Sequence, residues 1–428
     1  MTQTQTRTRR VHWAWCVAGV AFVALVGAAG FRAAPSVLIT PLHDEFGWST
    51  STISAAVSIN LLLYGLISPF AAALMEKLGM RRVVSGALLL VAAGSGLTVF
   101  MTESWQLLLL WGVCVGVGTG SMALTFVATV TSRWFVKHQG LVSGVLTAAG
   151  AAGQLVFLPV VAWLAEDGGW RQASLTVSFA ALAVVPLVLL ALRDRPEDVG
   201  TTAYGATGTE QAPPPAVNPG RAATRAVTVL RQAVRNRTFW LLAGGFAICG
   251  ASTNGLIGTH FVPAAHDHGM PVTTAAGLLA LVGLFDVAGT IASGWLTDKV
   301  DPRWLLGAYY SLRGLSLVVL PSLFAATTEP PMWAFIVFYG LDWVATVPPT
   351  VALTREVFGA DGPIVFGWVF ASHQVGAALA AVGAGLIRDH HGGYDPAWYI
   401  AGGLCAAAAV MSLRIRSQRR AAPATTAP

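Results

Sequence analysis

Hydrophobic residues form long runs along this chain, and shorter polar intervals separate the runs. Twelve runs are long enough to cross a membrane, since a spanning helix needs roughly 20 mostly apolar residues. The pattern predicts an all-α integral membrane protein with 12 transmembrane helices. The predicted spans are residues 12–40, 51–75, 82–101, 104–130, 138–164 and 170–192, then 238–264, 272–297, 304–325, 331–354, 363–388 and 394–413.

One long polar interval divides these spans six and six. The predicted organisation is a tail at 1–11, a six-helix bundle at 12–193, a linker at 194–237, a six-helix bundle at 238–413 and a tail at 414–428. Residues 200–220 are rich in Thr, Gly, Ala and Pro, which is typical of a disordered linker. After them, apolar residues alternate with arginines, which predicts a helix on the inner membrane face. These apolar residues are Val227, Val229, Leu230 and Val234.

Composition and charge support the membrane assignment and set its direction. Only 11% of the residues are charged, against about 25% in an average soluble protein, which excludes a soluble enzyme. Of the 26 Lys and Arg, all but four fall in alternate loops, the exceptions being Arg171, Arg388, Arg32 and Arg313. Because cytoplasmic loops carry the basic excess, we expect a multi-pass protein of the cell membrane with both termini cytoplasmic. Dispersed basic residues predict no nucleic-acid partner.

The two halves repeat each other in sequence. Charged residues of the loop after span two recur after span eight at an offset of 222 residues, and an arginine after span four recurs after span ten. The pairs are Glu76 and Asp298, Lys77 and Lys299, Arg81 and Arg303, and Arg133 and Arg355. Four pairs at one offset indicate an internal repeat. Two parallel six-span halves are typical of transporters whose substrate site lies at the midplane between them.

The repeated loops carry a family resemblance. The segment Gly294-Trp295-Leu296-Thr297-Asp298-Lys299 resembles the signature loop of the major facilitator superfamily, and the first copy differs by Glu76 and Ala72. Three further segments resemble its monocarboxylate-porter and oxalate–formate-antiporter branch. They are Asp44-Glu45-Phe46-Gly47-Trp48-Ser49, Arg133-Trp134-Phe135 followed by Gly140, and Gly169-Trp170-Arg171.

This resemblance implies two pseudo-symmetric six-helix halves of the major facilitator fold and transport of a small organic anion, proton-coupled or by exchange. We expect a monomer in contact with membrane lipid. Two positions depart from the family patterns. Thr290 follows Asp286 by about one turn, where such porters often carry an arginine, and Trp111 stands near an arginine of sugar porters and many drug exporters. These departures weaken the substrate assignment by family. Drug or metabolite efflux on the same fold is the alternative function.

Four formal charges lie deep inside predicted spans: Arg32, Asp286, Arg313 and Asp342. Each costs roughly 2.5 to 3.5 kcal/mol at mid-membrane, so a partner or a function is expected. Asp286, Arg313 and Asp342 sit near the middle of consecutive spans, which predicts an ion pair or triad with Arg313 as a structural counter-ion. Asp286 and Asp342 are also candidates for proton coupling. Complete neutralisation among the four is the structural alternative.

Arg32 is the predicted substrate contact, because no acidic residue lies at its depth on spans two to six. A guanidinium fork suits a carboxylate. The repeat offset places Asn254 opposite Arg32 and Tyr64 opposite Asp286. With His373 and Gln374 of span eleven, these residues form the predicted substrate-binding set. The alternative for Arg32 is pairing with the acidic residues of the other half, and for the other residues it is structural hydrogen bonding within the bundle. Histidine, with a reference pKa of about 6.5, is a further candidate for proton coupling.

The remaining sequence features concern gating, helix packing and the outer surface. The repeated loops are predicted to gate the inner side through Glu76, Lys77, Arg81, Asp298, Lys299 and Arg303. Glycines at 112, 116, 118 and 120 predict close helix packing. Five histidines are expected at the outer surface: His260, His266, His268, His390 and His391. No Walker motif, metal-ligand spacing or nucleophile elbow is visible, so we expect no cofactor, no metal and no enzyme. A membrane enzyme or solute sensor would require a catalytic cluster or a signalling domain.

Overall fold

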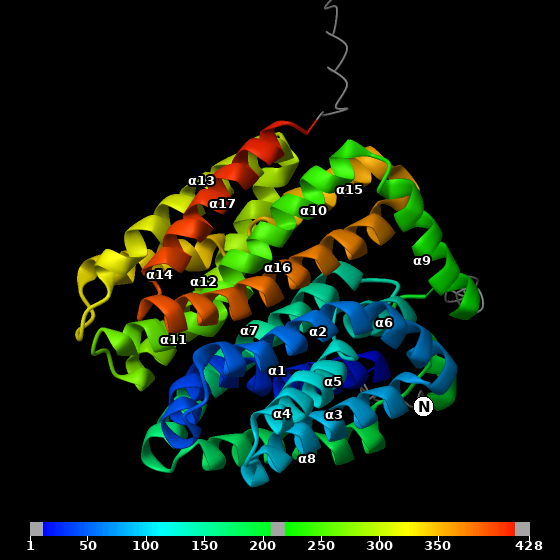
Figure 1. The fold of residues 1–428 in the computed structure, drawn as a ribbon. Helices are drawn as coiled ribbons and strands as arrows, with labels where there is room; N and C mark the ends of the chain where they lie inside the picture. The colour runs from blue at the N-terminus through cyan, green and yellow to red at the C-terminus, as the bar shows by residue number, and fades with distance from the viewer. Residues whose placement is uncertain (1–11, 207–218, 416–428) are drawn as a thin grey trace, which may run out of the picture.

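The structure, a computed structural model, describes residues 12–206 and 219–415. Helices of the first half pack together in the lower part of Figure 1, and those of the second half lie above them. The first half contains α1 (Trp13–Phe46), α2 (Thr50–Leu78), α3 (Met80–Leu97), α4 (Ser104–Leu107), a π-helical segment (Leu108–Val115), α5 (Gly116–Gly120), α6 (Leu124–Trp134), α7 (Gln139–Asp167) and α8 (Trp170–Ala191).

The linker contributes α9 (Pro219–Ala233). The second half contains α10 (Arg237–Gly250), a π-helical segment (Ala251–Ile257), α11 (Gly258–Asp267), α12 (Val272–Lys299), α13 (Pro302–Val319), α14 (Pro330–Asp342), α15 (Val347–Phe358), α16 (Gly362–His391) and α17 (Asp395–Leu413). Short 3₁₀ turns lie at Thr98–Phe100, Pro196–Val199, Leu320–Leu323 and Gly359–Asp361.

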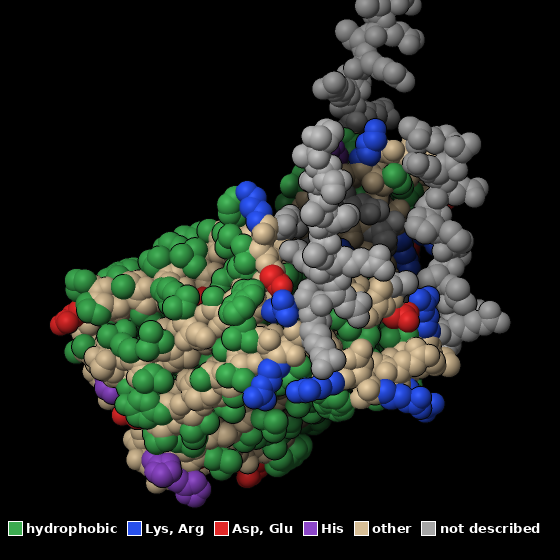
Figure 2. Space-filling model, turned by 90° about the horizontal axis from the view of Figure 1, so that it is seen from above, with side chains coloured by type: hydrophobic (Ala, Val, Ile, Leu, Met, Phe, Trp, Pro, Cys, Tyr) green, Lys and Arg blue, Asp and Glu red, His purple; other side chains and the backbone are tan. Residues whose placement is uncertain are grey.

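Every predicted span falls on helical structure. Ten helical stretches in the described ranges are long and apolar enough to cross a membrane, and the stretches at 104–134 and 302–323 complete the twelve. Figure 2 shows hydrophobic side chains over the flank of the bundle, while most Lys and Arg side chains gather towards one end. This distribution suits a bundle whose flank contacts lipid.

Spans four and ten are each interrupted, at positions that correspond in the internal repeat. In the first half the helix is interrupted at 121–123, and in the second at 343–346, which is the same place after the 222-residue offset. Pro348 and Pro349 start the helix again in span ten, where proline lacks the amide that an unbroken helix needs. The repeat read from the loop charges therefore extends to the backbone.

Glycines bring helices into close contact, as the sequence predicts for span four. A Cβ at Gly112 would lie 3.0 Å from the Ile59 side chain, and one at Gly116 would lie 3.0 Å from the Asn60 Cα. The second half uses the same device: a Cβ at Gly250 would clash with the His373 carbonyl oxygen. Each substitution would push two helices apart, so these glycines fix the interaxial distance.

One face of the helix α9 packs against the second-half helices α10 and α16. Val229 is 5% exposed and Ala233 is 2% exposed, in a core cluster with residues of α10 and α16. Trp368 of α16 donates a hydrogen bond of 3.1 Å to the Ala226 carbonyl, and Arg225 lies 3.3 Å from Asp361. Val227 points outwards and is 42% exposed, so a membrane-facing surface of α9 stays a prediction.

Candidate functional site

The break between α14 and α15 lies at the centre of the candidate site. A helix that is interrupted inside a membrane leaves backbone groups unpaired, and each must find a partner because no water is available. Two charged side chains from neighbouring helices provide partners here. Arg313 of α13 donates to the carbonyl oxygens of Asp342 and Trp343, at 2.5 and 3.3 Å. Asp286 of α12 accepts the Val344 amide at 3.0 Å.

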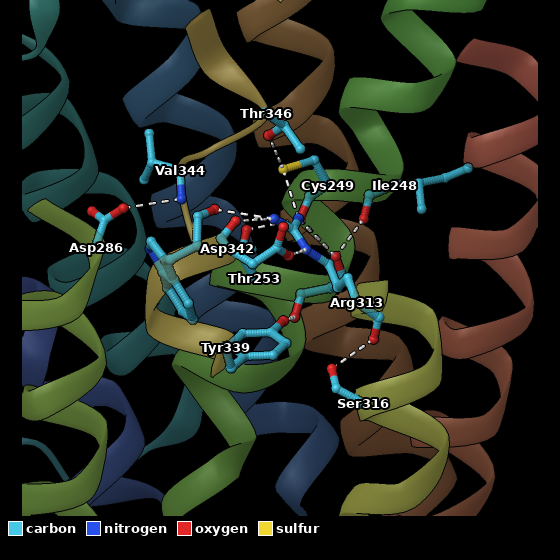
Figure 3. Close-up of polar contacts among 12 residues, drawn as sticks. Ile248, Cys249, Thr253, Asp286, Arg313, Ser316, Tyr339, Asp342, Val344 and Thr346 are labelled. Carbon is cyan, nitrogen blue, oxygen red and sulfur yellow. Dashed lines mark hydrogen bonds and ion pairs between the residues drawn. The ribbon is translucent and has the colours of Figure 1, made fainter. Parts of the chain in front are cut away.

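Arg313 and Asp342 also form a buried ion pair. The Arg313 Nε donates to Asp342 Oδ2 at 2.6 Å, and the two residues are 0% and 5% exposed. A second guanidinium nitrogen contacts the Cys249 sulfur at 2.9 Å (Figure 3). The same nitrogen lies 3.5 Å from the Ser252 hydroxyl. The Arg313 charge therefore has an acidic partner and several dipoles. The sequence predicted Asp286, Asp342 or both as its partner, and the structure forms the pair with Asp342.

Asp286 lies on the other side of the break from the ion pair (Figure 3). Its carboxylate accepts hydrogen bonds from two neutral groups, the Val344 amide and the Thr290 hydroxyl, each at 3.0 Å. Thr290 occupies the position where the family resemblance leads one to expect an arginine, and here it is a neutral donor to Asp286. Among the described side chains, no cation lies within ion-pair distance of Asp286. The groups in direct contact with its charge are therefore neutral, and Arg313 acts on it only from a longer distance.

The π-helical segment 251–257 carries polar groups to the same depth. Tyr339 of α14 donates to the Ser252 carbonyl at 2.9 Å, and Thr346 at the break lies 3.2 Å from the Cys249 sulfur. Asn254 is half-buried, and its carbonyl accepts the Thr259 hydroxyl at 2.9 Å. A π-helical turn leaves backbone groups misaligned, and these contacts satisfy some of them.

His373 and Gln374 of α16 contact different helices, α10 and α2. The His373 ring lies against Phe246 and Phe370, with ring centroids 4.9 and 5.8 Å away. Gln374 is 1% exposed and lies against α2, since a Cβ at Gly65 would lie 2.7 Å from the Gln374 Cβ. Gln374 therefore sits where the two halves touch. Its side-chain oxygen has no hydrogen-bond donor among the described residues.

On the first-half side, Tyr64 is half-buried on α2, and Asn60 one turn earlier donates to the Trp111 carbonyl at 3.0 Å. Arg32 is part of the helix α1, but its side chain lies outside the described residues. The structure therefore brings Asp286, Arg313 and Asp342 together around one break, and it places Tyr64, Asn254, His373 and Gln374 on other helices. The binding roles of these residues remain predictions.

The predicted gating loops are partly described. The side chains of Glu76 and Asp298 lie outside the described residues, and Lys77 is exposed. Lys299 lies over the Trp295 ring, 3.7 Å from its centroid, and Arg303 forms an ion pair with Asp301 at 2.6 Å.

One residue that the sequence analysis missed binds the first of the two loops that are predicted to gate. The Arg81 amide donates to the Asp194 carboxylate at 2.9 Å, and Gly79 has a φ of +89° where that carboxylate leaves no room for a Cβ. Asp194 follows the sixth span by two residues. No spacing links it to a loop more than a hundred positions earlier, so only the fold reveals this contact.

One histidine differs from the prediction. His260 was expected at the outer surface, but it is wholly buried in α11, and its Nε2 lies 2.8 Å from the Ala381 carbonyl. The reason is that α11 turns this face towards α16 rather than towards water. Since a carbonyl oxygen only accepts, the hydrogen is on Nε2.

Comparisons with known proteins agree with this architecture. A family model described as Major Facilitator Superfamily matches residues 20–353 and 253–428. The chain is 27% identical over 389 residues to an uncharacterized MFS-type transporter, YcxA, of Bacillus subtilis, covering 89% of this chain and 90% of the relative. It is 29% identical over 397 residues to monocarboxylate transporter 13 of Rattus norvegicus, covering 91% and 86%.

Solved structures are similar in fold at low identity. A D-xylose-proton symporter superposes with a TM-score of 0.70 at 15% identity, covering 94% of this chain and 98% of the symporter. A bacterial homolog of the human lysosomal transporter Spinster superposes with a TM-score of 0.72 at 15% identity, covering 94% and 96%.

Proposed function

The chain belongs to the major facilitator superfamily, and on that premise we propose that it is a secondary transporter of a small organic anion, a mono- or dicarboxylate. Transport proceeds by alternating access of the two halves and is driven by a proton or by exchange for a second anion. The relatives that share most of the chain's length include monocarboxylate transporters, which supports this substrate class.

One observation carries the proposal. Of the two arginines inside spans, Arg313 is bound to Asp342 and to backbone carbonyls, so its charge is already balanced. Arg32 is the other cation at membrane depth. The sequence places no acidic residue at the depth of Arg32 on spans two to six, and an anionic substrate would stabilise such a cation. Its guanidinium offers two parallel hydrogen bonds to a carboxylate.

The remaining polar residues have supporting roles in this proposal. Tyr64, Asn254, His373 and Gln374 donate hydrogen bonds to the substrate as the halves close on it. Asp286 takes up the proton that accompanies the anion, because its carboxylate is held by neutral donors and gains most from protonation when the site closes. His373 is the second candidate for this proton.

Efflux of a drug or metabolite is the second candidate function. Thr290 in place of the family's arginine favours it, since the second half then offers the acidic Asp286 without that cation. A cationic or neutral solute would use this carboxylate directly.

A transport assay separates the two. Purified protein in liposomes, with the inside buffered one pH unit higher than the outside, is offered labelled monocarboxylates, dicarboxylates, amines and hydrophobic drugs. The proposal predicts accumulation of a carboxylate that stops when the pH gradient and any internal anion are removed. Accumulation of amines or drugs, with no carboxylate moved under any gradient, would contradict it.

A further inference from the structure

Two helix pairs provide the most extensive contact between the two halves, α2 with α16 and α7 with α12. We call the end of these helices that lies away from α9 the outer end, which the loop charges predict to face outside. At this end α2 and α12 begin, while α7 and α16 finish. The starting helices present free backbone amides there, and the finishing helices carry acidic residues in their last turn.

Asp389 of α16 caps the first turn of α2. Its two carboxylate oxygens accept the amides of Thr50 and Ser51, at 3.0 and 2.9 Å. These amides have no partner within α2, and the positive end of the helix dipole favours a negative charge at this place. The bond crosses from the second half to the first.

Glu166 of α7 makes the corresponding contact in the opposite direction. Its carboxylate accepts the Thr273 amide in the first turn of α12, at 3.0 Å. Thr273 and Ser51 are repeat-related, because they lie 222 residues apart. Each half thus places a carboxylate on the matching helix end of the other half, so the two caps are pseudo-symmetric.

Two other carboxylates at the outer end stay within their own half. Glu45 of α1 binds Arg171 of α8 at 2.6 Å, and Asp267 of α11 binds Arg388 of α16 at 2.8 Å. Glu45 and Asp267 are repeat-related as well. The outer end therefore contains two ion pairs that brace single halves and two caps that join the halves.

Below the Asp389 cap, α2 and α16 are in direct contact. A Cβ at Gly385 would lie 2.9 Å from the Ser51 Cα and the Ser54 hydroxyl, and Ser58 donates to the Ala378 carbonyl at 2.7 Å. Ser54 is 0% exposed. The seam between the halves is thus closed here, and it must separate before a solute could enter from this end.

We propose that Asp389 and Glu166 are latches that hold the outer end closed and so set the balance between outward-open and inward-open states. When the halves separate at this end, both carboxylates lose their amide donors and the ends of α2 and α12 lose their caps. Asp389 accepts two amides and Glu166 one, so Asp389 is the stronger latch. This inference rests on the alternating-access part of the proposed function and on no particular substrate.

The test measures how often the α2–α16 contact opens, and it uses no substrate. Ser54→Cys places a thiol in the closed seam, and its rate of labelling by a polar maleimide in purified, detergent-solubilised protein reports opening of the outer end. The same protein without this cysteine gives the background from Cys16, Cys114, Cys249 and Cys405. Because no solute is added, the result stands even if the carboxylate assignment fails.

We expect Asp389→Asn to raise the labelling rate roughly fivefold, Glu166→Gln to raise it less and the double variant most. Asp267→Asn and Glu45→Gln are matched controls that remove the same charge at the same end, and they should label like the parent. An unchanged rate in the double variant, or equal increases in the controls, would overturn the proposal.

A second variant guards against a carboxylate change that harms folding. Thr50→Pro removes one amide donor of the Asp389 cap and leaves every charge in place. Proline is accepted at the first position of a helix, and Ser49 before it already has an extended backbone with ψ of 150°. The latch predicts faster labelling in this variant too, whereas a rate equal to the parent's would contradict it.

Discussion

The backbone amide of Val344 donates a hydrogen bond of 3.0 Å to the carboxylate of Asp286, and so ties α12 to the break in span ten. Arg313 holds the same break from the other side through two carbonyl oxygens. Any change in the charge of Asp286 therefore acts on a discontinuous helix that already carries the buried ion pair. This arrangement suits a site where protonation and helix movement are coupled.

Asp286→Asn should remove the pH dependence of transport without unfolding the protein. The amide oxygen of asparagine still accepts the Val344 amide, but it takes up no proton. In the parent we expect anion uptake to rise as pH falls, because protonation of the carboxylate accompanies the anion. Uptake at several pH values checks this, with Thr290→Val as the control that keeps the carboxylate. A pH response that survives in Asp286→Asn and vanishes in His373→Gln would assign the proton to His373.

Arg313→Ala should lower the yield of folded protein sharply. Removing one member of a buried pair leaves an unpaired charge and costs roughly 3 to 5 kcal/mol. The double variant Arg313→Ala with Asp342→Ala should recover most of the yield, whereas Arg313→Ala with Asp286→Ala should not. Gel filtration and thermal unfolding measure this. A stable single variant that only loses substrate affinity would place Arg313 in the binding site instead.

Arg32→Gln should abolish anion binding in a protein that remains folded, and Arg32→Lys should weaken binding in part, since lysine keeps the charge but loses the fork. Arg388→Gln, an arginine at the outer end, is the control for removing a positive charge. Binding of carboxylates to the purified variants is the measurement. Parental affinity of Arg32→Gln for every anion tested would refute this assignment.

Gly289→Ala should destabilise the second half. A Cβ at Gly289 would lie only 1.9 Å from the Leu341 carbonyl oxygen, just before the break, so α12 and α14 would have to move apart. Overpacking of this kind costs about 1 to 3 kcal/mol. Gly277→Ala on the same helix is the matched control, because nothing lies within 4 Å of its Cβ. Equal unfolding temperatures for the two variants would contradict the packing argument.

The Glu45 and Arg171 pair should lose its contribution in acid. The Arg171 side chain lowers the pKa of Glu45 below its usual value, so the pair stabilises the folded state above that usual pKa and is lost as pH falls through the lowered one. The Arg171 side chain is 45% exposed and the Glu45 side chain 38%. Because water screens such a pair, we expect it to contribute less than about 1 kcal/mol to the free energy of unfolding. Thermal unfolding of the parent and Glu45→Gln should differ at pH ~7 and converge at pH ~3.

The order of the spans, the division into halves and the internal repeat were predictable because they depend on local features. An apolar run of the right length forms a spanning helix in lipid whatever its neighbours are, and loop charges recur at one offset whether or not the helices touch. Helix ends follow the predicted spans within a few residues. The breaks in spans four and ten confirm the repeat without having been predicted.

The partners of the charged residues depended on tertiary structure. Periodicity places Asp286, Arg313 and Asp342 at similar depth but does not give the rotation of three helices, which decides that Asp342 binds Arg313 while Asp286 binds a backbone amide.

The caps at the outer end join Asp389 to Thr50 and Ser51 across more than 300 positions, and His260 is buried because α11 turns it towards α16. Local sequence determines which segments enter the membrane, since lipid acts on each helix separately. Only packing between the helices determines which polar groups meet, since hydrogen bonds depend on distances of a few tenths of an ångström.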